Sequence, residues 1–162
     1  MDSELALPTL VEDEKGLRRF LEDLDRATEI GVDTEGDSFF SYPEKVCLVQ
    51  VTALEHDWLV DPLAGLDLSG LGRLMADPAR LKIFHDGEYD VLSLKRDYQF
   101  QFKNLFDTRV AAAALGAQNP GLASVLLLRG PTDGFLFHLS RAAEAVPDGT
   151  LAAWLDGVIS AG

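Results

Sequence analysis

The chain has 162 residues, 47% of them hydrophobic, which is enough for one domain with a core and too few for two. Its formal net charge of −13 argues against a broad phosphate-binding surface, because proteins that grip nucleic acid through its backbone are usually basic. No apolar run approaches the roughly 18 residues that span a bilayer, and the first residues lack the basic and apolar regions of a signal peptide, so we expect no membrane partner.

The first half of the chain predicts one helix followed by three strands. Four apolar side chains repeat at helical spacing within residues 11–27: Leu17, Phe20, Leu21 and Leu24. Strands are expected near 29–35, over 45–53 and over 57–60, and the second is the most apolar and β-branched. The short connections between these three strands favour an antiparallel meander.

The only cysteine, Cys47, lies in the apolar run of the second predicted strand. A single cysteine excludes an intrachain disulfide, which fits a reducing compartment, so we expect a cytoplasmic protein. Cys47 itself is expected to be a small core residue.

The second half predicts helices around one further strand. The helices are expected over 66–76, 87–98, 111–115 and 121–128, and the strand over 81–84. Because a helix precedes this strand, the connection is interpreted as a crossover that lays the strand parallel to an earlier one. Asp107 stands where the helix near residue 111 needs an N-cap.

Two carboxylates follow one another at the end of the first predicted strand. Asp33 and Glu35 are two residues apart, so in an extended strand both side chains point to the same face. Acids held this close repel each other unless a cation lies between them, and hard oxygen ligands suit Mg²⁺ or Mn²⁺. The alternative is a solvated loop with spare acids. A metal site would also let an acidic chain hold a short single-stranded end.

A second acidic cluster lies in the stretch from His85 to Asp90. Asp86 and Asp90 are four residues apart at a predicted helix start, where the helix dipole favours carboxylates. They are therefore either simple helix-start residues or part of a site. In the second interpretation, Asp90 reaches back toward the first acidic pair and completes a metal cage.

Five stretches in order resemble the ribonuclease D group of DEDD 3′–5′ exonucleases: Asp33-Thr34-Glu35, Lys45 to Val51, Lys82-Ile83-Phe84-His85 with Asp90, Leu105-Phe106-Asp107-Thr108, and Gly121 to Val125. The resemblance implies an RNase H-like α/β fold, with a mixed sheet of about five strands flanked by helices. It divides the chain into an exonuclease core over 1–126 and an atypical tail over 127–162, so that the fold is expected to be C-terminally truncated or altered.

The resemblance also implies a metal-dependent hydrolysis that removes nucleotides from the 3′ end of single-stranded nucleic acid, with RNA favoured over DNA. In this scheme Asp33 bridges two Mg²⁺ or Mn²⁺ ions, and Glu35 and Asp90 each bind one. One ion lowers the pKa of the attacking water and the other stabilises the leaving oxygen.

Three further residues are expected to contact the substrate: Thr34, Phe39 and His85. Phe39 could stack on a terminal base, since aromatic stacking tolerates any base; the alternative is a partly buried core residue. His85 is either a structural residue that bonds the backbone of the site or a substrate contact.

The third motif of the family has no counterpart in this sequence. That motif is a tyrosine or histidine followed a few residues later by a fourth metal-binding aspartate. All tyrosines precede residue 99, and His138, the only histidine beyond Leu126, has no aspartate four or five residues after it. Loss of such a catalytic group typically costs on the order of 10²–10⁴-fold in rate. The sequence therefore predicts either an impaired exonuclease or a non-catalytic binding or assembly module, with a homodimer formed through residues 127–162.

Overall fold

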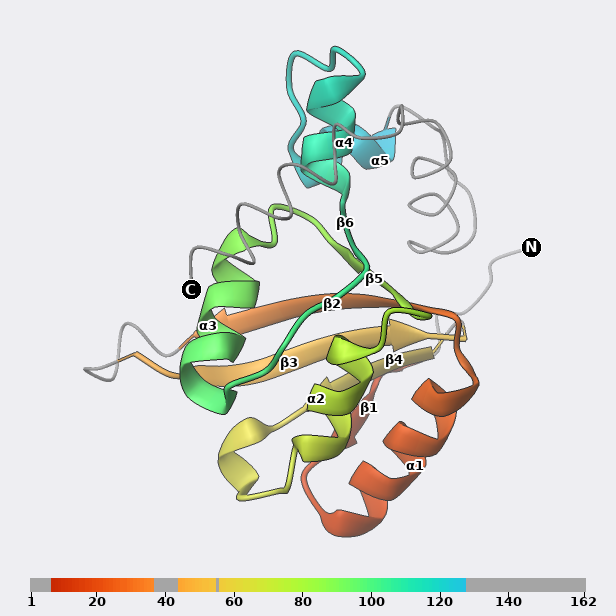
Figure 1. Ribbon diagram of the computed structural model, residues 1–162, viewed down its shortest axis with the longest axis vertical. Coiled ribbons are helices and arrows are strands. Elements are labelled where there is room, and N and C mark those ends of the chain that lie inside the picture. The colour runs from red at the N-terminus through yellow and green to blue at the C-terminus, as the bar shows by residue number, and fades with distance from the viewer. Residues whose placement is uncertain (1–6, 37–43, 55, 128–162) are drawn as a thin grey trace.

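A mixed six-stranded sheet is the centre of the computed structural model, which describes residues 7–36, 44–54 and 56–127 (Figure 1). The strands are β1 (Thr9–Val11), β2 (Glu29–Gly36), β3 (Val46–Ala53), β4 (His56–Val60), β5 (Leu81–Phe84) and β6 (Leu105–Asp107). The helices are α1 (Glu14–Arg26), the short 3-10 helix η1 (Pro62–Ala64), α2 (Ser69–Ala76), α3 (Glu88–Tyr98), α4 (Thr108–Ala114) and α5 (Leu122–Leu127). None of the helices in these ranges is both long and apolar enough to cross a lipid bilayer.

The strand order β1-β4-β3-β2-β5-β6 confirms the expected topology. β2, β3 and β4 form the antiparallel meander, and β5 lies parallel to β2 after the crossover through α2. The sheet has six strands instead of about five, because β1 pairs in parallel with β4 at one edge and β6 pairs in parallel with β5 at the other.

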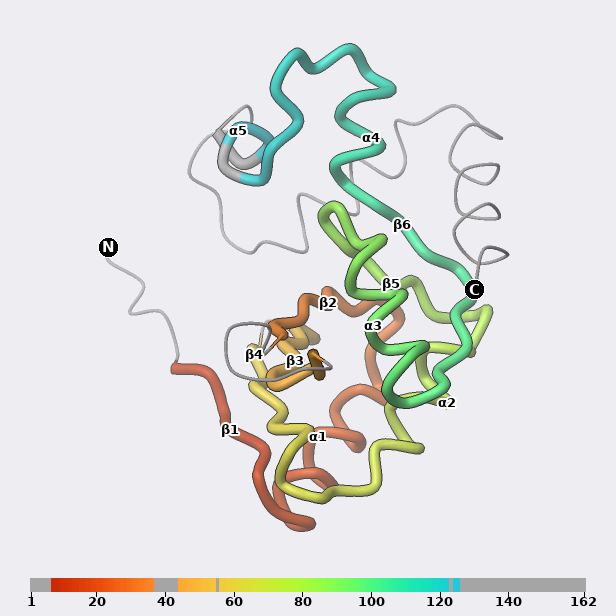
Figure 2. The backbone as a smooth tube through the Cα atoms, turned by 90° about the vertical axis from the view of Figure 1, so that its left-hand side faces the viewer, coloured from red at the N-terminus to blue at the C-terminus, as the bar shows by residue number. Residues whose placement is uncertain are grey.

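Three helices cover one face of the sheet and form the core with it. Figure 2 shows α2 and α3 on the same side of β2 and β3, and α1 closes the core beside β4. The buried cluster joins apolar residues of these three helices and of the strands, among them Phe20, Val32, Val51, Leu71 and Leu94. α4 and α5 lie beyond β6 (Figure 1). The opposite face of β2, β3 and β4 carries residues of the candidate site.

The first helix starts three residues later than its periodicity predicts. Asp13 caps α1 by accepting a hydrogen bond from the backbone N–H of Gly16 at 2.6 Å, and Leu17 is buried on the core face. Val11 does not belong to the helix, because it is fully buried in β1 and pairs with Val60 of β4. A three-residue strand whose partner lies some fifty residues away leaves no local pattern to detect.

A buried lysine fixes the entry into β5. Lys82 has no exposed surface, and its Nζ donates hydrogen bonds to the carbonyl oxygens of Asp77 and Arg80 at 2.6 and 2.7 Å. Burial of the ammonium lowers the pKa of Lys82 to about 8. The family-like stretch from Lys82 to His85 thus begins with a lysine whose hydrogen bonds stabilise the turn between α2 and β5.

Candidate active site

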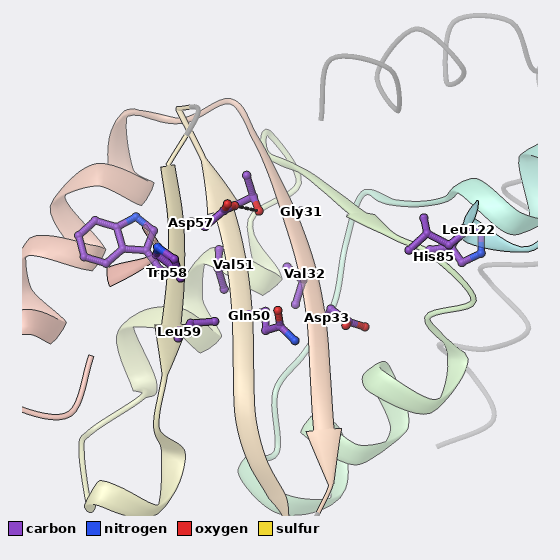
Figure 3. A pocket seen from close by; sticks show the side chains of 12 residues that line it. Gly31, Val32, Asp33, Gln50, Val51, Asp57, Trp58, Leu59, His85 and Leu122 are labelled. Carbon is purple, nitrogen blue, oxygen red and sulfur yellow. Dashed lines mark hydrogen bonds between the residues drawn. The ribbon is translucent and has the colours of Figure 1, made fainter. Parts of the chain in front are cut away.

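An open groove of about 400 Å³ crosses the face of the sheet that lies opposite α1, α2 and α3 (Figure 3). Two rows of directly paired residues form much of its floor: Gly31–Thr52–Asp57 and Asp33–Gln50–Leu59. His85 and Leu122 line it on the side of β5 and α5. In Figure 3, Asp33 points from β2 toward the side on which His85 lies. The groove is therefore lined by both the exposed carboxylate of Asp33 and the half-buried imidazole of His85.

Asp90 contacts the strand that carries Asp33 but does not itself line the groove. Asp90 stands in the first turn of α3 and is buried, with only 6% of its surface exposed. Oδ1 accepts hydrogen bonds from the backbone N–H of Thr34 at 2.9 Å and from the Thr34 hydroxyl at 2.6 Å. Desolvation raises the pKa of Asp90 to about 6, and the negative charge of Asp33 adds to the rise. Two acids far apart in sequence are thus brought together.

The end of one strand pairing makes room for Asp90. β5 pairs with β2 only from Glu29 to Gly31, whereas β2 continues along β3 as far as Gly36. Beyond Gly31 no strand of the described residues pairs with the edge of β2 that faced β5, so the N–H of Thr34 needs another acceptor. The carboxylate of Asp90 supplies that acceptor.

Glu35 lies on the same strand as Asp33 and is exposed, as the two-residue spacing predicts. The register of β2 and β3 shifts between Glu35 and Gly36, and the Cys47 thiol donates to the carbonyl oxygen of Glu35 at 3.4 Å. Cys47 is half-buried, so the expectation of a core cysteine is wrong. Within the described ranges, no three His, Cys, Asp or Glu side chains lie close enough together to hold a metal ion. The charge of Asp33 acts on Asp90, and Glu35 does not complete a three-acid cluster with them among the described residues.

The other residues expected to contact substrate fall in different surroundings. Thr34 is buried, 8% exposed, and is engaged with Asp90, so it faces the core and does not line the groove. His85 does line the groove, and its Nδ1 lies 2.8 Å from the Thr108 hydroxyl oxygen. Burial lowers the pKa of His85, against the opposing charges of nearby acids. Phe39 lies outside the described residues.

Sequence reasoning missed the part that Asp107 plays at this site. It caps α4 as predicted, but its buried carboxylate also accepts hydrogen bonds from the backbone N–H groups of Asp86 and Gly87. Asp86 has a φ of 62°, and its side chain pairs with Arg109 of α4. A helix-start Asp-Gly beside a second predicted N-cap is the only sequence signal for this contact.

Gly87 is expected to tolerate no side chain. A Cβ at this position would lie 2.6 Å from Cγ of Phe84, so Gly87→Ala forces the start of α3 away from β5. Such overpacking typically costs about 1–3 kcal/mol of unfolding free energy, measured by urea denaturation. Gly121→Ala is the control, because its Cβ would meet only the Asn119 side chain at 3.4 Å. Equal stability of the two variants would contradict this close packing.

Comparison with known proteins shows the family to which the chain belongs. The family model described as 3′-5′ exonuclease matches residues 8–127, which include the site. The chain belongs to the 3′–5′ exonuclease domain family. The resemblance to the ribonuclease D group of DEDD exonucleases, drawn from the sequence, is thereby confirmed.

Curated relatives share this exonuclease domain and are much longer. The chain is 36% identical to the exosome complex exonuclease RRP6 of Saccharomyces cerevisiae over 122 residues, which cover 75% of the chain and 17% of that protein. It is 35% identical to the exosome complex component 10 homolog of Caenorhabditis elegans over 120 residues, which cover 74% of the chain and 14% of that protein. The chain thus spans less than a fifth of the length of either relative.

Solved structures of the family share the fold. The catalytic core of RRP6 from Trypanosoma brucei aligns with a TM-score of 0.72 and 24% identity, over 94% of this chain and 43% of that one. Escherichia coli RNase D aligns with a TM-score of 0.70 and 22% identity, over 96% of this chain and 48% of that one. The expected α/β exonuclease fold is confirmed.

Proposed function

We propose that this chain is the core of a metal-dependent exonuclease, which hydrolyses phosphodiester bonds at the 3′ end of single-stranded nucleic acid. Membership of the exonuclease domain family supports this function. The observation that carries it is the buried carboxylate of Asp90, held by two hydrogen bonds to the neighbour of Asp33 in β2, while Asp33 itself lines the open groove.

The donors of this site fit a hard divalent cation, Mg²⁺ or Mn²⁺. Two carboxylates that repel each other, one of them desolvated, are the arrangement that a divalent cation stabilises. Asp33 and Asp90 would hold the ion or ions, and we propose Glu35 as the third ligand. A bound divalent ion lowers the pKa of the attacking water and offsets the charge that develops on the phosphate.

The other residues of the site would position the Asp90 carboxylate or the bound strand. Thr34 fixes the Asp90 carboxylate through two hydrogen bonds to the same oxygen, so we assign it to the support of Asp90 in place of direct substrate contact. His85 lines the groove and is our candidate for a contact to the bound strand. We propose Phe39 as a stacking platform for a terminal base.

RNA is our preferred substrate. Escherichia coli RNase D, whose fold this chain shares, is an exoribonuclease involved in structured RNA processing. RNase D of Trypanosoma brucei has a solved complex with RNA, and its TM-score with this chain is 0.66. A single strand fits the charge of the chain, because a metal-bound 3′ end requires no broad basic surface.

The polarity of digestion tests the proposal. With Mn²⁺, a strand labelled at its 3′ end should release the label as a mononucleotide from the first time points, while the same strand labelled at its 5′ end should shorten stepwise. Excess EDTA should stop both reactions. Internal cleavage products, or equal release in EDTA, would contradict a metal-dependent 3′–5′ exonuclease.

A second candidate is a non-catalytic binding or assembly module that self-associates through residues 127–162. The absence of a three-acid cage within the described part of the chain favours it. Such a module would bind nucleic acid or a second copy without turnover, and light scattering at micromolar concentration should then report a dimer. A single-chain mass would contradict self-association. The domain boundary near residue 126 and the cytoplasmic location stay predictions.

A further inference from the structure

The carboxylate of Asp107 does more than an N-cap requires. Asp107 is only 2% exposed, and its carboxylate accepts hydrogen bonds from four backbone N–H groups. Oδ1 accepts from Arg109 at 2.8 Å and from Val110 at 3.1 Å, the two bonds that cap α4. Oδ1 also accepts from Asp86 at 3.1 Å, and Oδ2 from Gly87 at 2.7 Å. Asp107 therefore ties the loop between β5 and α3 to the start of α4.

Two contacts of the neighbouring hydroxyl favour one tautomer of His85. Thr108 is 1% exposed, and its hydroxyl lies 3.1 Å from the carbonyl oxygen of Phe84, which can only accept a hydrogen bond. Both this contact and the 2.8 Å contact between the hydroxyl oxygen and Nδ1 of His85 are hydrogen bonds only if the hydroxyl donates to Phe84 and Nδ1 donates to the hydroxyl. The arrangement that satisfies both contacts therefore places the proton of neutral His85 on Nδ1 and the lone pair on Nε2.

We propose that Asp107 and Thr108 are positioning residues that hold the loop carrying His85 and present its Nε2 to the groove as a hydrogen-bond acceptor. This inference rests on the proposed function in one respect, namely that the groove receives the nucleic-acid strand. An acceptor at this place selects a donor, such as a hydroxyl group of the bound strand, and disfavours a phosphate oxygen. The opposite tautomer would reverse that preference.

The tautomer can be read directly in the full chain. The sequence has three histidines, so ¹⁵N-histidine labelling gives a small set of ring signals in long-range ¹H–¹⁵N correlation spectra. At pH 8 we expect His85 to show a protonated Nδ1 and an unprotonated Nε2. Thr108→Val removes the acceptor of the Nδ1 proton, so the Nε2-protonated form should become the major one. Thr108→Ser keeps the hydroxyl and should restore the original pattern.

A matched Thr–His pair at the other edge of the sheet supplies the control. The Thr9 hydroxyl oxygen lies 2.8 Å from Nε2 of His56, the same separation as at His85. Thr9→Val should therefore shift the ring signals of His56 and leave those of His85 in place. For Asp107, the variant Asp107→Asn keeps Oδ1 and turns an amide toward Gly87, so the Gly87 amide proton should lose its protection from exchange.

Activity gives a second readout. Loss of one hydrogen bond at the site should lower kcat/KM on a single strand roughly 3–10-fold in Thr108→Val, with Thr108→Ser close to the parent and Thr9→Val unchanged. A wild-type His85 protonated at Nε2, or a tautomer that Thr108→Val leaves unchanged, would overturn the inference, and the wild-type and serine spectra decide it even where the valine variant fails to fold. A wild-type chain with the expected tautomer and no turnover would refute the proposed function alone.

Discussion

Asp33→Ala should lower kcat on a 3′-labelled single strand by about 10³-fold or more, because the variant loses the carboxylate that lines the groove and whose charge acts on Asp90. Asp33 is exposed and caps no helix, so the variant should keep the parent's thermal stability. The initial rate of label release in Mn²⁺ measures the effect, with the melting temperature recorded beside it.

Glu29→Ala is the control for charge. Glu29 lies on the same strand and the same face as Asp33, at the end of β2 that pairs with Leu81. Four residues of extended strand separate it from Asp33 by roughly 13 Å. Both variants remove one negative charge, so a rate loss that depends only on net charge would appear in both. Equal turnover in wild type and Asp33→Ala would remove the assignment of Asp33.

Asp90→Asn should stabilise the metal-free protein while it abolishes activity. The asparagine carbonyl can still accept the two hydrogen bonds from Thr34, and the cost of a buried charge disappears. Because the pKa of Asp90 is raised from 3.8 to about 6, the gain at neutral pH should be roughly 1–3 kcal/mol. Urea denaturation in EDTA measures it. Added Mn²⁺ should then stabilise the wild type and not the variant.

The pH dependence follows from the same shift. Folded Asp90 holds its proton up to about pH 6, whereas the unfolded residue releases it near pH 3.8. The contribution to stability is therefore fully present below pH 3.8, falls as the pH rises through 6, and is absent from Asp90→Asn.

Asp97→Asn, the same substitution on α3, should have the opposite sign. Its hydrogen bond with Arg96 lowers the pKa of Asp97, and its carboxylate also accepts from the N–H of Val46. Destabilisation by both variants would contradict the account of Asp90.

The sequence predicts the larger elements because each carries a complete local pattern. The face of α1 formed by Leu17 and Phe20, and the apolar β3, lie where periodicity places them. β1 and β6 are three residues each, too short for a periodic signal, and they form only because β4 and β5 offer partners distant in sequence. Pairing of this kind is a property of the assembled sheet.

The candidate site divides in the same way. The two-residue spacing of Asp33 and Glu35 fixes their common face, and the position of Asp90 at a helix start is readable from sequence. Its bond to the Thr34 backbone depends on where β5 stops pairing with β2, which no local pattern contains. The hydrogen bond from the Gly87 N–H to Asp107, twenty residues away in sequence, likewise requires the folded sheet.

Anomalous diffraction from a crystal soaked in Mn²⁺ tests the central claim most directly. We expect a manganese peak coordinated by oxygens of both Asp33 and Asp90, with the Asp90 carboxylate still held by Thr34. Manganese bound elsewhere on the chain, with these two carboxylates pointing apart and sharing no ion, would contradict it.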